Sequence, residues 1–258
     1  MSLRNPLRLR KSGADPTLKF TPTTDLEPSS DPSSLRSIAA RHSGTRFVKW
    51  LHYFDVYDRH MSEFLAERAR RGLTEPLRVL EIGVWRGGSL ELWREFLGDD
   101  AVIFGVDIDP ESARVPSDTA KVRTGSQTDQ AFMRGVLQEM GGVDLIVDDG
   151  SHRSQDVLES LRFLYPALAC PGLYIIEDLH TSYWADWGGG FKSKRSSLEQ
   201  MKSLVDVLHT PYMDAHVDEF GLGLTHSSLK GVHFYDSMVV LEKDDVPEPT
   251  PYRGGSWE

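Results

Sequence analysis

Two pairs of acidic residues end apolar segments of the sequence and could together bind a metal ion. Asp148 and Asp149 follow the run VDLIV, and Glu177 and Asp178 follow GLYII. If both runs are adjacent parallel strands, four carboxylates meet at one edge of the sheet, where they repel one another unless a cation neutralises them. Oxygen ligands favour a hard divalent ion such as Mg²⁺. Cys170 is the single cysteine, so a cysteine cluster for a softer metal is excluded.

Two histidines follow these acids closely. His152 comes three residues after Asp149 in DDGSH, where a turn can aim its imidazole at the same edge. Because an imidazole titrates near neutral pH, we predict that His152 is a general base. His180 is expected to orient a ligand or contact a substrate. Helix capping is the simpler explanation for one acid, but it does not account for four acids and two histidines at neighbouring strand ends.

A glycine-rich turn after the run LRVLEIGV indicates a nucleoside ligand. Glu81 and Gly83 lie at the end of this run, and WRGGS leads into a helical pattern, so backbone and helix N-terminus can approach a ligand closely. Trp85 stands where a dinucleotide fingerprint needs a glycine, which argues against NAD and FAD. Asp107 ends the next run, at roughly the 20-residue spacing where an acid binds ribose hydroxyls. A tight turn and a capping acid are the plainer alternatives, but their combination favours a nucleoside.

The segments that position these residues alternate between strand and helix patterns. Five short runs rich in aliphatic and β-branched residues predict strands: LRVLEIGV, AVIFGVDID, KVRTGS, VDLIVDDG and GLYIIED. Helical patterns separate several of them, for example from Gln130 to Met140. This order predicts an α/β fold with a Rossmann-like, doubly wound, mostly parallel sheet and helices on both faces. Ligands of such sheets bind beyond the carboxyl ends of the strands.

The two ends of the chain depart from this pattern. Residues 1–43 lack apolar periodicity and predict an extended or partly disordered arm that adds little core. Residues 44–258 form the predicted domain, which opens with an amphipathic helix from Thr45 toward Arg71. A further helix is expected from roughly Ser193 to His209, followed by a loop over 210–227. The segment SLKGVHFYDSMVVLEKD predicts a hairpin that adds an antiparallel edge strand to the sheet.

The composition excludes several classes of protein. The chain has 39 acidic and 29 basic residues and a formal net charge of −10, which argues against binding to nucleic acid. Hydrophobic residues make up 39% of the chain, enough for an ordinary core, and no apolar run has the length of a membrane span. The start MSLRNPLRLRKSG lacks the apolar stretch of a secretory signal. We therefore expect a cytoplasmic protein that binds neither nucleic acid nor membranes.

Five segments together resemble the class I S-adenosylmethionine-dependent methyltransferases: VLEIGVWRGGSLELW, IFGVDIDP, TGSQTD, IVDDGSH and YIIEDLHTSYW. The nearer likeness is to the metal-dependent sugar O-methyltransferases of macrolide and other glycosylated natural products, including rhamnosyl enzymes. It spans roughly Phe47 to Lys243 and is most specific where DDGSH is paired with EDLHTSYW. The resemblance implies S-adenosylmethionine and Mg²⁺ as cofactors, methyl transfer to a sugar hydroxyl, and a homo-oligomer.

The resemblance also implies a role for each residue of the site. Contacts to the cofactor are implied for Glu81, Gly83, Asp107, Ser126 and Gln127, with Asp148 either beside the cofactor or behind the metal. Magnesium ligands are implied at Asp149, Glu177 and Asp178. A loop facing the substrate is implied for Thr181, Ser182, Tyr183 and Trp184, next to His180. In this scheme His152 takes the proton from the sugar hydroxyl as the methyl group arrives.

Three other functions fit parts of the same pattern. A catechol or other phenolic diol also chelates Mg²⁺ through adjacent oxygens, so it is the main alternative acceptor. A non-catalytic protein that binds S-adenosylmethionine and assists another enzyme is the second, because one fold can host unrelated functions. The third is a hydroxylase, which is disfavoured because the sequence shows no clear pattern of two histidines and one carboxylate for iron.

Overall fold

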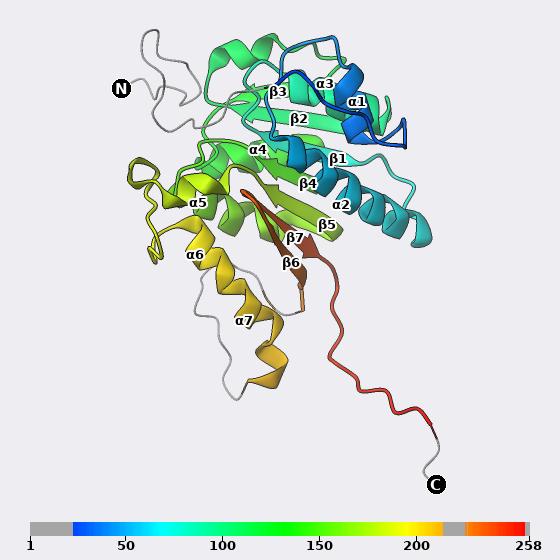
Figure 1. The fold of residues 1–258 in the computed structure, drawn as a ribbon, viewed down its shortest axis with the longest axis vertical. Coiled ribbons are helices and arrows are strands. Elements are labelled where there is room, and N and C mark those ends of the chain that lie inside the picture. The colour runs from blue at the N-terminus through cyan, green and yellow to red at the C-terminus, as the bar shows by residue number, and fades with distance from the viewer. Residues whose placement is uncertain (1–22, 214–224, 226, 256–258) are drawn as a thin grey trace.

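A seven-stranded sheet forms the centre of the protein in the computed structural model, which describes residues 23–213, 225 and 227–255 (Figure 1). The strands are β1 Arg78–Ile82, β2 Val102–Asp107, β3 Lys121–Thr124, β4 Val143–Asp148, β5 Leu168–Ile176, β6 Leu229–Tyr235 and β7 Met238–Lys243. Their order in the sheet is β3-β2-β1-β4-β5-β7-β6. Strands β1 to β5 pair with one another in parallel, which confirms the predicted doubly wound fold.

The C-terminal hairpin extends the sheet beyond β5. Strand β7 is antiparallel to β5 on one side and to β6 on the other. The hairpin thus forms the antiparallel edge of the sheet that the sequence predicts, with β7 against β5 and β6 outermost. The hairpin places its second strand against β5 since the apolar run of β7, Met238 to Leu241, is fully buried.

Helices cover both faces of the sheet (Figure 1). They are α1 Leu35–Arg41, α2 Leu51–Arg70, α3 Gly88–Leu97, α4 Gln130–Met140, α5 Ser154–Leu164, α6 Ser197–Lys202 and α7 Leu204–Leu208. Alternate strand residues contribute to two cores: Leu80 packs with residues of α4 to α7, and Val79 packs with residues of α1 to α3. This alternation follows from the two-residue period of a strand. Among the described residues no helix combines the length and apolar character needed to cross a membrane.

The N-terminal segment is more ordered than the sequence predicts. Within the expected arm, Leu35–Arg41 forms α1, and Leu35 and Ile38 are buried against the core. Ser34 caps this helix by accepting a hydrogen bond from the Ser37 N–H. Helix α1 thus adds core residues to the segment expected as an extended or partly disordered arm with little core, and its seven residues are too few to show a clear helical period in the sequence. Residues 1–22 lie outside the described residues.

The other helical predictions differ from the structure mainly at their boundaries. Helix α2 begins at Leu51 instead of Thr45, because Thr45 donates hydrogen bonds from its backbone N–H and its hydroxyl to Glu91. The segment expected from Ser193 to His209 contains two short helices, α6 and α7, that meet at Ser203. Of the loop expected over 210–227, residues 214–224 and 226 lie outside the described residues.

Candidate active site

The carboxyl ends of the three central strands lie at one level and bring the predicted acids together. Asp148 pairs in register with Ile82 of β1 and with Ile176 of β5. The ladder continues one step further, since the Asp149 N–H donates to the Ile82 carbonyl and the Glu177 N–H donates to the Asp148 carbonyl. The two acidic pairs are therefore side by side at the end of the sheet, as the parallel arrangement predicts.

Three of the predicted residues form a group that could hold a metal ion. The Nε2 atom of His152 lies 3.7 Å from Asp149 Oδ1 and 3.8 Å from Asp178 Oδ2. One ligand atom from each of these residues lies within 4.8 Å of the others. The His152 side chain is 7% exposed and each carboxylate 21%, so the group is sheltered and still open to a small ligand.

The backbone at two of these residues is strained. His152 has φ of 57° and Asp178 has φ of 55°, both in the left-handed region that costs a non-glycine residue free energy. The buried hydroxyl of Thr181 donates to the carbonyl oxygens of His152 and Asp178, at 2.9 and 2.8 Å. The Tyr53 hydroxyl accepts from the Asp178 N–H and donates to Asp178 Oδ1. These bonds hold both strained residues with their side chains facing each other.

Lys49 joins the acids from the segment before α2. Its Nζ donates to Asp149 Oδ2 at 2.7 Å and to Glu177 Oε1 at 2.5 Å, and its side chain is only 7% exposed. The hydroxyl of Tyr57 also donates to Glu177 Oε1. Glu177, a predicted metal ligand, is therefore held by Lys49 and Tyr57 and does not belong to the group of Asp149, His152 and Asp178.

Burial governs the protonation of these groups. It raises the pKa of Glu177 to about 8, and the neighbouring Asp149 carboxylate adds to the effect. Burial also raises the pKa of Asp149, although Lys49 and His152 oppose it. Burial disfavours the ammonium form of Lys49, but the two carboxylates outweigh it and raise the Lys49 pKa. Burial and mutual repulsion thus oppose full ionisation of these acids, and a bound cation would favour their charged forms.

Sequence reasoning missed the contribution of α2 to this site. Lys49, Tyr53 and Tyr57 contact the acids, and the Trp50 indole N–H donates to Asp178 Oδ1 at 3.2 Å. The pattern FVKWLHYFDVY is typical of an amphipathic helix that packs on the core, so it did not indicate a contribution to the site. The available signals were a lysine inside this apolar segment and two tyrosines four residues apart, which share one helix face.

The residues of the glycine turn fix the shape of the first strand end. Glu81 is completely buried and accepts hydrogen bonds from Ser89 and from the Trp93 indole N–H, and burial raises its pKa. Gly83 has φ of 92°, and a Cβ added there would lie 2.0 Å from the Asp149 carbonyl oxygen. Glu81 therefore anchors α3, while Gly83 permits β1 and β4 to approach at the site.

The predicted ribose acid and adenine residues lie at the ends of β2, β3 and β4. Asp107 is half-buried, and its two oxygens accept hydrogen bonds from the Trp85 and Asp109 N–H groups, both at 2.8 Å. Gln127 accepts from the Ser151 N–H at 2.8 Å and donates to Asp148 Oδ1 at 3.2 Å.

Asp148 and Ser126 complete this side of the site. The carboxyl of Asp148 is buried near Gln127 and Tyr174, and burial raises its pKa to about 7. Ser126 is half-buried with its hydroxyl 3.0 Å from the Thr128 hydroxyl. Asp148 thus contacts Gln127 and Tyr174, whereas Asp149 contacts Lys49, because consecutive side chains at a strand end point to opposite faces of the sheet.

The residues of the predicted substrate loop occupy different environments. His180 lies between the rings of Trp50 and Trp184, with Nδ1 2.5 Å from the Ser237 hydroxyl. Thr181 is buried and holds the backbone, and the buried Ser182 hydroxyl is 2.8 Å from that of Ser197. The structure thus gives Thr181 and Ser182 supporting positions. Tyr183 is 49% exposed and Trp184 half-buried, so His180, Tyr183 and Trp184 remain the accessible members.

Comparisons with known proteins agree with this geometry. A family model described as a methyltransferase domain matches residues 80–179, which include the glycine turn and both acidic pairs. The chain is 36% identical over 231 residues to 8-demethyl-8-(2-methoxy-alpha-L-rhamnosyl)-tetracenomycin-C 3'-O-methyltransferase from Streptomyces olivaceus, covering 86% of this chain and 56% of that protein. It is 32% identical to mycinamicin VI 2''-O-methyltransferase from Micromonospora griseorubida, covering 81% and 52%.

A solved structure shows the same fold. The MycE methyltransferase from the mycinamycin biosynthetic pathway, in complex with Mg, SAH and mycinamycin VI, is 30% identical with a TM-score of 0.65. The match covers 82% of this chain and 55% of MycE. The chain spans about half the length of the curated relatives it matches. The sheet order and the glycine turn agree with the match of residues 80–179 to a methyltransferase domain.

Proposed function

We propose that the protein is a Mg²⁺-dependent O-methyltransferase that transfers a methyl group from S-adenosylmethionine to a sugar hydroxyl of a glycosylated natural product. The observation that carries the proposal is the group of Asp149, His152 and Asp178 at the end of a methyltransferase-type sheet. Two findings on similar proteins support the proposal. The relatives named above are O-methyltransferases of a rhamnosyl tetracenomycin and of mycinamicin VI, and the MycE structure contains Mg and SAH.

The residues present fit a magnesium ion. Asp149 and Asp178 offer carboxylate oxygens, the ligands that Mg²⁺ prefers. Glu177 lies close to Asp149, since the Nζ atom of Lys49 donates hydrogen bonds to both carboxylates. We propose Asp149, Glu177 and Asp178 as the ligands. A bound Mg²⁺ would orient adjacent sugar oxygens and lower the pKa of one hydroxyl.

His152 is the proposed general base. Its Nε2 atom would accept the proton of the sugar hydroxyl while the oxygen bonds to the methyl carbon and the bond from that carbon to sulfur breaks. The imidazolium that results is stabilised by the carboxylates of Asp149 and Asp178, at 3.7 and 3.8 Å. Thr181 holds the His152 backbone in position through its hydrogen bond to the carbonyl. Alignment and base catalysis are the main requirements, because the sulfonium is already a good leaving group.

The cofactor would lie along the ends of β1, β2 and β4. We propose that Asp107 exchanges its backbone partners for the ribose hydroxyls, or accepts both, and that Gly83 borders the methionine part. Ser126 and Gln127 would line the adenine pocket, with Asp148 behind them. His180, Tyr183 and Trp184 are the proposed substrate contacts, since their side chains are accessible.

Titration calorimetry tests the cofactor and metal parts of this proposal. The protein is titrated with S-adenosylhomocysteine (SAH), the demethylated product of the cofactor, after treatment with a chelator and again with Mg²⁺ restored. We expect SAH to bind in both conditions and Mg²⁺ to bind the wild type more tightly than Asp149→Asn. Absence of SAH binding in every condition would exclude an S-adenosylmethionine-dependent enzyme.

A panel of acceptors separates the sugar from a phenolic diol. A phenol is more acidic than an alcohol and needs less help from a base, so methylation of a catechol should tolerate His152→Ala better than methylation of a deoxysugar glycoside. We expect the wild type to methylate a rhamnosyl glycoside and the variant to lose that activity. Turnover of catechols alone would favour the phenolic acceptor, and tight SAH binding without turnover of any diol would favour a non-catalytic role.

We also propose that the protein forms a homo-oligomer. Strand β6 is the outermost strand of the sheet, and within residues 23–213, 225 and 227–255 no further strand pairs with its outer edge. Such an edge offers free backbone groups to a second chain. Light scattering coupled to size-exclusion chromatography should give a mass above the 29.0 kDa of one chain, whereas a mass equal to one chain would refute the proposal.

A further inference from the structure

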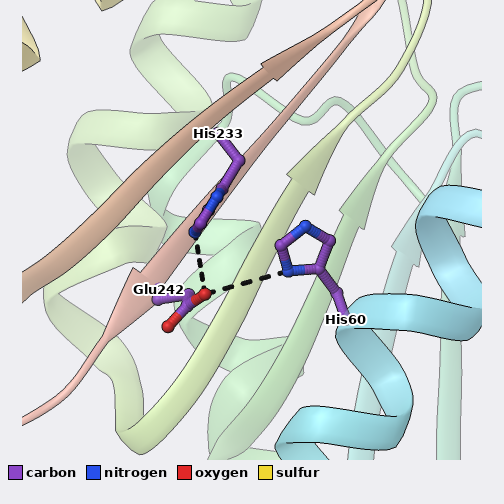
Figure 2. A group of neighbouring side chains, drawn as sticks. All are labelled: His60, His233 and Glu242. Atoms are coloured by element: carbon purple, nitrogen blue, oxygen red, sulfur yellow. Dashed lines mark hydrogen bonds and ion pairs between the residues drawn. The ribbon is translucent and has the colours of Figure 1, made fainter.

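A second cluster of metal-ligating side chains lies away from the candidate active site. It consists of His60 from α2, His233 from β6 and Glu242 from β7, and Figure 2 shows the three side chains facing one another. Glu242 pairs in register with Leu173, three residues before the end of β5 at Ile176. At about 3.3 Å per residue, the cluster is set back about 10 Å along the strands from the end of β5, which the acids follow.

The donor atoms of this cluster have nearly the spacing of a metal site. Glu242 Oε1 lies 2.8 Å from His233 Nε2 and 3.8 Å from His60 Nδ1, and one ligand atom from each of the three residues lies within 4.8 Å of the others. Ligands of a tetrahedral zinc ion, each about 2.1 Å from the metal, are about 3.4 Å apart. The observed separations of 2.8 and 3.8 Å lie on either side of that value.

The surroundings prepare His60 to bind through Nδ1. Its Nε2 atom lies 2.8 Å from the Tyr235 hydroxyl, and its side chain is 1% exposed. A histidine ligand usually has its other ring nitrogen hydrogen-bonded in this way, which fixes the orientation of the ring. Lys230 Nζ lies 3.7 Å from Glu242 Oε2, so it faces the oxygen that does not face the histidines.

We propose that His60, His233 and Glu242 bind a divalent transition-metal ion, for which Zn²⁺ fits best. Two imidazole nitrogens and one carboxylate oxygen are a common zinc ligand set, whereas Mg²⁺ prefers oxygen ligands alone. A water molecule would complete the tetrahedron. The ion would link the middle of α2 to the C-terminal hairpin and so hold α2, which carries Tyr53 and Tyr57, against the sheet.

Zinc titration of the protein without a histidine tag tests this site. The candidate active site also contains a histidine, so the measurement is made in the Asp149→Asn background, which weakens that site. The chelator-treated protein is titrated with Zn²⁺ in competition with a chromophoric chelator. The test variants are His233→Ala and Glu242→Gln, and the matched control is His209→Ala, which removes the histidine that caps the C-terminus of α7, outside the cluster.

We expect one equivalent of Zn²⁺ to bind and to raise the melting temperature. His233→Ala and Glu242→Gln should each weaken binding at least tenfold and abolish the rise, while His209→Ala changes neither. Circular dichroism verifies that each variant is folded; if His233→Ala is not, the nearly isosteric Glu242→Gln decides. Equal zinc affinity in Glu242→Gln and His209→Ala, or no zinc binding by the folded protein, would overturn the proposal. Either result is independent of methyltransferase activity.

Discussion

At the scale of single residues, the candidate site depends on a few side chains whose positions are held by others. His152 and Asp178 adopt left-handed backbone conformations, and Thr181 and Tyr53 hold them there. Strain of this kind persists only where the surrounding structure fixes it, and it is common at functional sites. Variants of His152 and of two neighbouring buried residues, Lys49 and Asp148, test the account at this scale.

His152→Ala should lower kcat for a sugar acceptor by about 10²- to 10⁴-fold, the usual contribution of a general base. The dissociation constant for SAH should stay nearly unchanged, because His152 lies on the metal side of the site. Steady-state kinetics and calorimetry measure the two effects, and His209→Ala serves as the control. Near-normal turnover by His152→Ala would remove this residue from the proposed role.

Lys49→Met should destabilise the fold, because it leaves Asp149 and Glu177 buried without their cation. Removal of one partner from a buried ion pair typically costs about 3–5 kcal/mol. Urea denaturation in the presence of a chelator measures this loss, and added Mg²⁺ should restore part of it. Lys202→Met, which breaks a surface pair with Glu199, should have little effect, and an equally small effect of Lys49→Met would contradict the assignment.

Asp148→Asn should change how stability depends on pH. Burial raises the pKa of folded Asp148 to about 7, above its ordinary value of 3.8. The folded state therefore holds a proton that the unfolded state releases, and the wild type loses stability as the pH rises from about 4 to 7. Since one pKa unit corresponds to about 1.4 kcal/mol, the variant should gain a few kcal/mol over the wild type at pH 8 and little at pH 4. A constant difference across this range would contradict the prediction.

At the scale of elements, the strands were predictable and the helix boundaries less so. Helix α4 was predicted with its observed bounds, Gln130–Met140, because Asp129 and Gly141 cap a clear amphipathic pattern. Helix α1 was missed because it has only seven residues and depends on packing against the core. The start of α2 was misplaced because the bonds from Thr45 to Glu91 join residues distant in sequence. Lys49 was missed for the same reason, since its partners Asp149 and Glu177 directly follow β4 and β5.

Substitution of Gly83 tests the close approach of β1 and β4. Gly83→Ala should strongly destabilise the protein and weaken SAH binding, because its Cβ would lie 2.0 Å from the Asp149 carbonyl oxygen and its φ is 92°. Gly135→Ala is the control, since Gly135 lies inside α4 with no atom within 4 Å of the added Cβ. Alanine is favoured over glycine in a helix by about 1 kcal/mol, so Gly135→Ala should raise the melting temperature. Equal tolerance of both variants would contradict the proposed role of Gly83.

At the scale of the whole molecule, the parallel sheet explains why residues distant in sequence form one site. The ends of β1, β4 and β5 lie at one level, so the turn at Gly83, the acid Asp149 and the acid Asp178 converge. The sequence sufficed to predict this convergence, because strands that alternate with helices form a parallel sheet whose carboxyl ends share one edge. It did not suffice to predict the layer that α2 adds, since an amphipathic helix shows which face is apolar but not which polar side chains reach a strand end.

The most direct test of the account is transfer of a labelled methyl group from S-adenosylmethionine to a rhamnosyl glycoside of a natural product. The assay uses the wild type after chelator treatment, the same sample with Mg²⁺ restored, and His152→Ala with Mg²⁺. We predict O-methylation of the sugar only in the wild type with Mg²⁺. Transfer that the chelator leaves unchanged, or no transfer to any glycoside by protein that binds neither SAH nor Mg²⁺, would contradict the account.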